Sequence, residues 1–195
     1  MGKRIILAGV LGSIAMFVWS SLAHTVLPLG EVGVSQIPNE APVLSAMQTS
    51  MGQTSGLYFY PGFGVPKDAP REQRNAAMKD YGTKLAANPS GILIYHPPGA
   101  KALTPGQLGT EYLTELLECL LVAFLVARAG IAGYGARLGF IVVAGIMAAI
   151  TTNIPYWNWY GFPTDYTVAY ASTEIIGYLV AGLVIARMLK TAAST

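Results

Sequence analysis

Four long apolar stretches constrain the fold of this chain more than any other feature of its sequence. They lie at residues 5–27, 108–127, 133–154 and 167–188. Each holds about 20 residues, which as a helix covers the roughly 30 Å of a bilayer's hydrocarbon core. Only 11% of the chain is charged, whereas a soluble domain averages about 25%. The sequence therefore predicts an all-α membrane protein built on a bundle of four transmembrane helices.

Charge separates the two ends of these stretches. All ten acidic residues fall at positions 31–118 or 165–174. Since Lys and Arg collect on the cytoplasmic side of a membrane, we expect both termini inside and residues 28–107 on the outer, periplasmic side. This topology predicts a multi-pass protein of the bacterial inner membrane. The basic residues at the inner ends are Lys3, Arg4, Arg128, Arg137, Arg187 and Lys190.

The same pattern divides the chain into parts. We expect a first transmembrane helix at 1–27, an outer insertion at 28–107, and helices two to four at 108–195 with an aromatic outer loop at 155–166. The first stretch also resembles a secretory signal, with Lys3 and Arg4 before it and Ser-Leu-Ala at 21–23. Its apolar run is long for a signal, so we expect it to remain as a helix.

The insertion contains a weak repeat that indicates α/β structure. Residues 56–61 and 91–97 are both short aromatic and β-branched runs bounded by Gly and Pro, which is typical of buried strands. An apolar stripe with helical spacing precedes each run, at 43–51 and 77–85. The long connection between the strands favours a right-handed βαβ unit with parallel strands. Two strands bury little surface, so we expect this insertion to need support from the bundle or from a partner chain.

Polar residues gather in the outer half of the predicted bundle. Glu111, Glu115 and Glu118 are spaced i, i+4, i+7 and so share one face of the second helix. Glu174 reaches a similar depth on the fourth helix, and His24 lies near the outer end of the first. Carboxylates are costly in lipid, so we expect these side chains to face the bundle interior, a wet cavity or a bound partner.

Three interpretations of this polar pocket remain open. His24, Glu115, Glu118 and Glu174 are suitable donors for a metal ion, although the Glu-x-x-His pairs of carboxylate-bridged di-metal bundles are absent. A proton or cation pathway is the second interpretation, but no continuous row of ionisable groups crosses the inner half. Hydrogen bonding between helices, or to a basic partner, is the third and the most common use of such groups.

Aromatic residues crowd the segment between the third and fourth stretches. Rings with polar tips collect at membrane interfaces, and they also anchor protein interfaces. We therefore expect this segment to contact lipid or a partner subunit. The residues concerned are Tyr156, Trp157, Trp159, Tyr160 and Phe162.

Pairs of small residues four apart predict close helix contacts. They occur as Ala8 with Gly12, Gly135 with Gly139, and Gly177 with Ala181. Such pairs let helix backbones approach within a bundle or at an interface with another chain.

Three segments together resemble uncharacterised bacterial small integral membrane proteins. They are the Gly-Leu-Tyr-Phe-Tyr-Pro-Gly run at 56–62, the Asn-Trp-Tyr-Gly-Phe-Pro run at 158–163, and the glycine-containing last stretch. The resemblance covers most of the chain. It implies a membrane protein without an assigned activity, and it carries no catalytic or binding residue over to this sequence.

These features favour a non-catalytic accessory subunit of a larger membrane complex, such as an energy-transducing one. The alternative is a small transporter or metal-binding membrane protein that uses the Glu/His pocket. The sequence shows no complete set of catalytic residues and demands no cofactor. The expected partners are the lipid bilayer and other membrane subunits. A net charge of +2, concentrated at the inner ends, gives no reason to expect nucleic acid.

Overall fold

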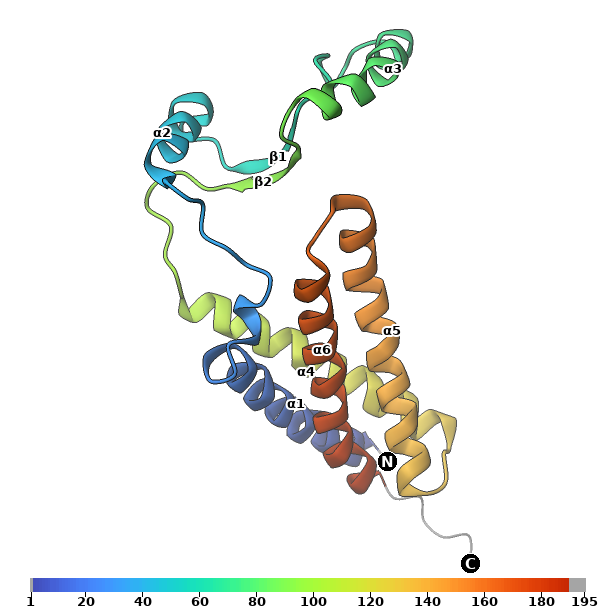
Figure 1. The fold of residues 1–195 in the computed structure, drawn as a ribbon. Helices are drawn as coiled ribbons and strands as arrows, with labels where there is room; N and C mark the ends of the chain where they lie inside the picture. Colours follow the sequence, from blue (N-terminus) through green and yellow to red (C-terminus); the bar gives the residue numbers. More distant parts are fainter. Residues whose placement is uncertain (1, 190–195) are drawn as a thin grey trace, which may run out of the picture. The chain divides into compact units, whose positions relative to one another are not determined.

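The computed structural model describes residues 2–189, so the predicted inner charge Lys190 lies outside the described residues. The chain forms two compact units (Figure 1). The helical unit comprises Met1–Ser35 and Ala102–Thr195, and the inserted unit comprises Gln36–Lys101. The inserted unit is shorter than the predicted 28–107 because the short 3-10 helix η1, Leu29–Glu31, packs against the helical unit.

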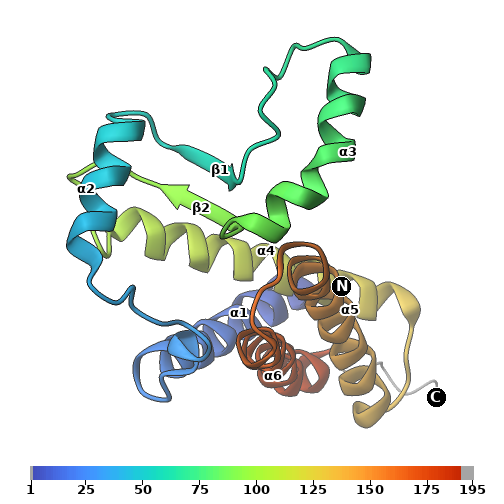
Figure 2. The same cartoon turned by 45° about the horizontal axis from the view of Figure 1, so that its top comes forward.

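Four long helices build the helical unit. They are α1 (Gly2–Thr25), α4 (Pro105–Ala129), α5 (Tyr134–Tyr160) and α6 (Thr164–Met188). They pack in the order α4, α1, α6, α5, and Figures 1 and 2 show α5 and α6 side by side. Adjacent helices in this order run antiparallel. In the pair α1 and α4, for example, the earlier residue Gly9 of α1 contacts the later residue Leu120 of α4, whereas Ser20 contacts Glu115. The four predicted stretches therefore correspond to four helices.

Three of these helices, α1, α5 and α6, are long and apolar enough to cross a membrane, as expected of a membrane protein. Helix α4 has the length but carries Glu111, Glu115, Glu118 and Arg128, which is more charge than a lipid-exposed span usually holds. Its composition alone therefore does not identify it as a fourth span.

The predicted aromatic loop at 155–166 is wrong in its boundaries. Helix α5 continues through Pro155 to Tyr160, and α6 begins at Thr164. A proline costs one backbone hydrogen bond, a loss that membrane helices tolerate when other groups compensate. The helix instead ends at Gly161, whose φ of 71° is the left-handed conformation that glycine adopts easily. Of the predicted loop 155–166, only residues 161–163 are not helical.

Helix α4 begins at a capping box. Thr104 accepts a hydrogen bond from the backbone N–H of Gln107, and the Gln107 side chain accepts one from the backbone N–H of Thr104. Pro105 follows at the first helical position, where its missing N–H costs nothing. Local sequence therefore fixes the start of this helix.

The inserted unit has the predicted order α-β-α-β, as α2 (Glu40–Met51), β1 (Gly56–Tyr60), α3 (Arg71–Ala87) and β2 (Gly91–Tyr95). The strands pair antiparallel, with Gly56 opposite Tyr95 and Tyr60 opposite Gly91. The predicted parallel βαβ unit is therefore wrong. Helices α2 and α3 lie at opposite ends of this ribbon (Figures 1 and 2).

Contacts of α3 explain the strand direction. Tyr81 donates a hydrogen bond to the carbonyl of Pro61 at 3.2 Å, and its ring lies 4.5 Å from that of Phe63. Lys84 donates to the carbonyl of Gly62. The helix thus packs along the segment that leads away from β1 and returns the chain to the same end of the ribbon. The connection is a long hairpin rather than a crossover over the sheet.

The main core lies in the helical unit, where small and branched side chains of α1, α4, α5 and α6 meet. Two of the three small-residue pairs contribute, because Ala8, Gly12, Gly177 and Ala181 are buried. The third pair, Gly135 and Gly139, is exposed on α5. The buried core cluster consists of Ala8, Met16, Cys119, Val122, Ala123, Val126, Ile141, Tyr178, Ala181, Ile185, Ala186 and Leu189.

Candidate functional site

A cavity of about 230 Å³ opens between α1, α4 and α6 in the helical unit. All five residues of the predicted polar pocket line it, and three of them, Glu111, Glu115 and Glu118, come from the same face of α4. No lysine or arginine is among its described lining residues. The lining residues are Met16, Trp19, Ser20, His24, Glu111, Thr114, Glu115, Glu118, Tyr170, Thr173, Glu174, Gly177 and Tyr178.

Glu115 is the most enclosed acid of the cavity, with only 6% of its surface exposed. Its Oε1 atom accepts a hydrogen bond of 2.7 Å from the Ser20 hydroxyl of α1. Its Oε2 atom is buried and has no hydrogen-bond partner among the described residues. Buried polar atoms are nearly always hydrogen-bonded, so this oxygen is the unusual feature of the site.

Glu118 and Glu174 each have partners on a neighbouring helix. The side chain of Tyr178 on α6 lies beside the carboxylate of Glu118 and interacts with it electrostatically. Glu174 Oε2 accepts from Thr152 Oγ1 at 2.9 Å and from Asn153 Nδ2 at 3.1 Å. These contacts link α6 to α4 on one side and to α5 on the other.

Glu111, Thr114 and His24 are the exposed members of the lining. Glu111 lies one turn before Glu115 on α4. The imidazole of His24 lies 5.9 Å from the ring of Tyr170, in a tilted arrangement. Four carboxylates therefore share one cavity, and the other titratable groups among its described lining residues are one histidine and two tyrosines.

A row of aromatic rings connects the α5–α6 turn to this cavity. Centroid separations are 5.4 Å from Tyr156 to Phe162, 5.4 Å from Phe162 to Tyr166, and 4.3 Å from Tyr166 to Tyr170. Three further predicted interface residues lie at the end of α5. Trp157 donates to Thr164 Oγ1 at 3.1 Å, and Trp159 is 79% exposed. The ring of Tyr160 lies 5.8 Å from that of Tyr156, in a tilted arrangement.

Trp19 is a site residue that sequence reasoning missed. Its indole N–H donates to the carbonyl of Thr173 at 2.9 Å, which joins α1 to α6 beside the cavity. Trp19 lies five residues before His24 on α1, and its place next to Ser20 in a polar helix end was the available signal.

The metal-binding interpretation finds no support in the geometry. Within residues 2–189, no three or more His, Cys, Asp or Glu side chains are arranged to hold one metal ion. His24, Glu115, Glu118 and Glu174 surround the cavity without converging on one point. The arrangement suits a cation larger than a bare metal ion, or water-mediated hydrogen bonds between helices.

The chain was compared with protein-family models, with curated proteins and with solved structures, and none of these matches it.

Proposed function

We propose that this protein is a non-catalytic accessory subunit of a larger integral membrane complex, and that its inserted unit binds the partner. One observation carries this proposal. In the inserted unit, all of which is described, only Ala69 and Tyr95 are buried. Helices α2 and α3 bury no residue at all. So small a core does not offset the conformational entropy lost on ordering the segment.

One face of the β-ribbon is suited to supply the missing burial. Leu57 pairs with Ile94 and Phe59 with Ile92, which places four large apolar side chains on one face. Leu57 is 61% exposed, Ile94 67% and Phe59 52%. Contiguous exposed apolar surface of this kind marks a protein interface. The opposite face carries Tyr95, whose hydroxyl donates to the carbonyl of Gly52 after α2.

The proposal includes α4 as a fourth transmembrane helix. Helix α4 packs antiparallel along α1, so both helices cross the same depth of membrane. Its carboxylates line the cavity, while Leu113, Leu117 and Leu121, spaced four apart, are 62%, 58% and 54% exposed. This division leaves an apolar face for lipid and a polar face for the bundle interior.

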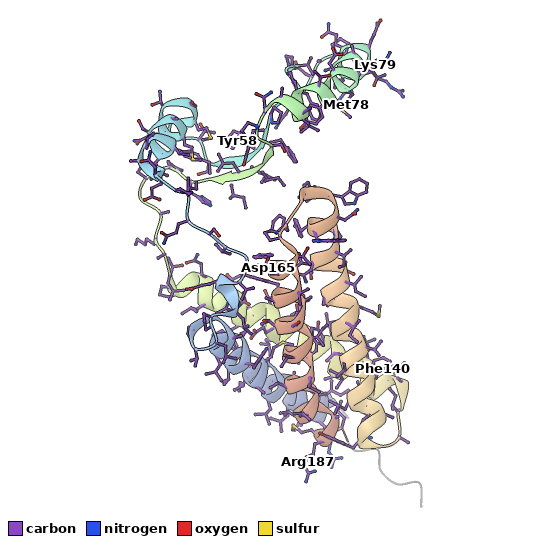
Figure 3. The ribbon with its side chains drawn as sticks, viewed as in Figure 1. Tyr58, Met78, Lys79, Phe140, Asp165 and Arg187 are labelled. Atoms are coloured by element: carbon purple, nitrogen blue, oxygen red, sulfur yellow. The ribbon has the colours of Figure 1, made fainter. Side chains whose placement is uncertain are left out.

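Charge placement supports an orientation with both termini in the cytoplasm. Asp165 and Arg187 lie at opposite ends of α6 (Figure 3). Arg128 ends α4, and Arg137 lies in the first turn of α5. Four antiparallel helices with their basic ends together match the positive-inside rule for an inner-membrane protein. The inserted unit then lies on the outer side.

The test is purification of a tagged full-length chain from its native membrane in mild detergent, followed by native electrophoresis and mass spectrometry. We expect a stoichiometric complex. The variant Leu57→Thr/Ile94→Thr should lose the partner, because threonine keeps the strand preference but removes apolar surface. Leu103→Thr, at a site in the helical unit that is 68% exposed, is the matched control. Purification of the wild-type chain alone, as a monomer or homo-oligomer, would contradict the proposal.

A further inference from the structure

We propose that the cavity between α1, α4 and α6 binds a small organic ammonium ion, namely an alkyl amine or diamine in its protonated form. This inference does not rest on the subunit role, because it concerns a site within the helical unit alone. The four carboxylates that line the cavity provide the charge that holds the cation, and Glu115 provides the central hydrogen-bond acceptor.

Glu115 Oε2 indicates that a donor is needed here. This oxygen is buried without a partner, while Ser20 already satisfies Oε1. A buried carboxylate oxygen that lacks a donor carries the full cost of its lost hydration. None of the other hydroxyl-bearing lining residues donates to this atom in the structure; they are Thr114, Tyr170, Thr173 and Tyr178. Less than 1 Å² of this oxygen is accessible in the structure, so an N–H group that enters the cavity would reach it after a rotation of the Glu115 carboxylate.

The arrangement of the walls favours an ammonium ion over a metal ion. An ammonium group has three donors that point in different directions, and so it can reach carboxylates that do not converge on one point. The metal alternative requires converging donors, which residues 2–189 do not provide. Trp19, Tyr170 and Tyr178 supply aromatic rings to the wall, and such rings attract organic cations.

Size and apolar lining favour a short alkyl chain. A liquid water molecule occupies about 30 Å³, so a cavity of about 230 Å³ accommodates a molecule of several non-hydrogen atoms. Met16 and Gly177 provide apolar surface between the carboxylates. A diamine could place its methylene groups there and present an ammonium group to an acid at each end.

The same lining argues against the headgroup of an aminophospholipid. Its ammonium group is attached to a phosphate, which four carboxylates would repel. A phosphate needs basic partners, and no Lys or Arg is among the described lining residues. The basic groups of α4, α5 and α6, such as Arg128, Arg137 and Arg187, belong to the opposite ends of these helices. A free amine therefore fits better than a lipid.

Calorimetric titration of the full-length protein in nanodiscs of phosphatidylcholine, with 1,4-diaminobutane as the probe, tests this inference. We expect saturable binding of one amine per chain, and no binding of the uncharged analogue 1,4-butanediol. Glu115→Gln should weaken binding by about 30-fold or more, because it leaves an ammonium group without its buried charged partner. Glu31→Gln is the matched control, since this exposed glutamate of the helical unit does not line the cavity.

Two measurements keep the test decisive if Glu115→Gln folds poorly. The first is far-UV circular dichroism of Glu115→Gln, which reports whether the helices persist. We expect them to persist, because the Ser20 hydroxyl can still donate to the glutamine oxygen. Glu118→Gln, which removes a second charge from the lining and keeps the shape of the side chain, should also weaken binding. Absence of saturable amine binding to the wild type would overturn the inference. So would tighter binding of Ca²⁺ that displaces the amine, or binding only when phosphatidylethanolamine replaces phosphatidylcholine.

Discussion

Replacement of Gly145 by alanine should destabilise the packing of α5 against α6. A Cβ atom at position 145 would lie 2.5 Å from Cβ and 2.7 Å from Cγ of Tyr178. These atoms are close to the α6 backbone, so a rotation of the tyrosine side chain cannot relieve the overlap. The helices must move apart, and the contact that buries Tyr178 to 8% exposure weakens.

Two opposing contributions decide how much stability Gly145→Ala loses. Overpacking a well-filled core costs about 1–3 kcal/mol, whereas Gly→Ala inside a helix gains roughly 0.5–1 kcal/mol. The expected net loss for Gly145→Ala is therefore about 1 kcal/mol, within a range of roughly 0–2.5 kcal/mol. Gly139→Ala on the same helix is the matched control, because nothing lies within 4 Å of a Cβ added there. It should be neutral or slightly stabilising.

Reversible unfolding in mixed dodecyl-maltoside and SDS micelles, followed by circular dichroism, would measure both variants. The difference in unfolding free energy between the two variants cancels the gain in helix propensity, which both share, and leaves the cost of overpacking at position 145. Equal stability of Gly145→Ala and Gly139→Ala would refute the close approach of α5 and α6 at this position.

Three further substitutions can be measured in the same unfolding assay. Thr104→Ala should cost about 1 kcal/mol, because it removes the cap of α4; hydrogen exchange should increase in the first turn of that helix and not at its end. Trp19→Phe should cost about 1 kcal/mol, since it keeps the ring but removes the bond to the Thr173 carbonyl; unchanged stability would show that this bond is dispensable. Arg137→Met should cost about 2 kcal/mol, because the buried guanidinium donates to the carbonyls of Ala186 and Ile131, whereas Arg128→Met at an exposed position should be nearly neutral.

The long helices could be predicted because apolar length is a local property of the sequence. Each predicted stretch lies within the corresponding helix, except that the first extends two residues past the end of α1 and the third begins one residue before α5. The exception is the C-terminal end of α5, where an aromatic loop was predicted to begin at Pro155. A proline forbids one hydrogen bond but not a helix, and the true end is set by the left-handed Gly161. That end depends on a glycine six residues beyond the proline.

The direction of strand pairing could not be predicted from spacing. A long connection with one helix can cross a sheet or fold back beside its own start. The choice depends on whether α3 packs on the ribbon or on the preceding segment. Tyr81 and Lys84 bind the carbonyls of Pro61 and Gly62, and nothing in the apolar stripe of α3 distinguishes these partners from a sheet face.

The residues of the site could be predicted, but most of their partners could not. Helical spacing placed Glu111, Glu115 and Glu118 on one face, and all three line the cavity. Which hydroxyl meets which carboxylate depends on the register between helices, which a single sequence does not contain. Ser20 therefore could not be assigned to Glu115, nor Thr152 to Glu174, before the structure was known.

Whether a small residue lies at a helix contact also depends on the register between helices. One such contact links the packing of α5 and α6 to the cavity. Gly135 and Gly139 have the spacing of a packing motif but are exposed, whereas Gly145 faces Tyr178, which lies beside Glu118. One tyrosine thus fills the gap that a glycine leaves on α5 and also contributes to the wall of the cavity. If the cavity binds an amine as proposed, Gly145→Ala should weaken that binding along with stability, because it displaces Tyr178. Gly139→Ala should change neither, and a loss of binding in that control would show that the two effects do not share this residue.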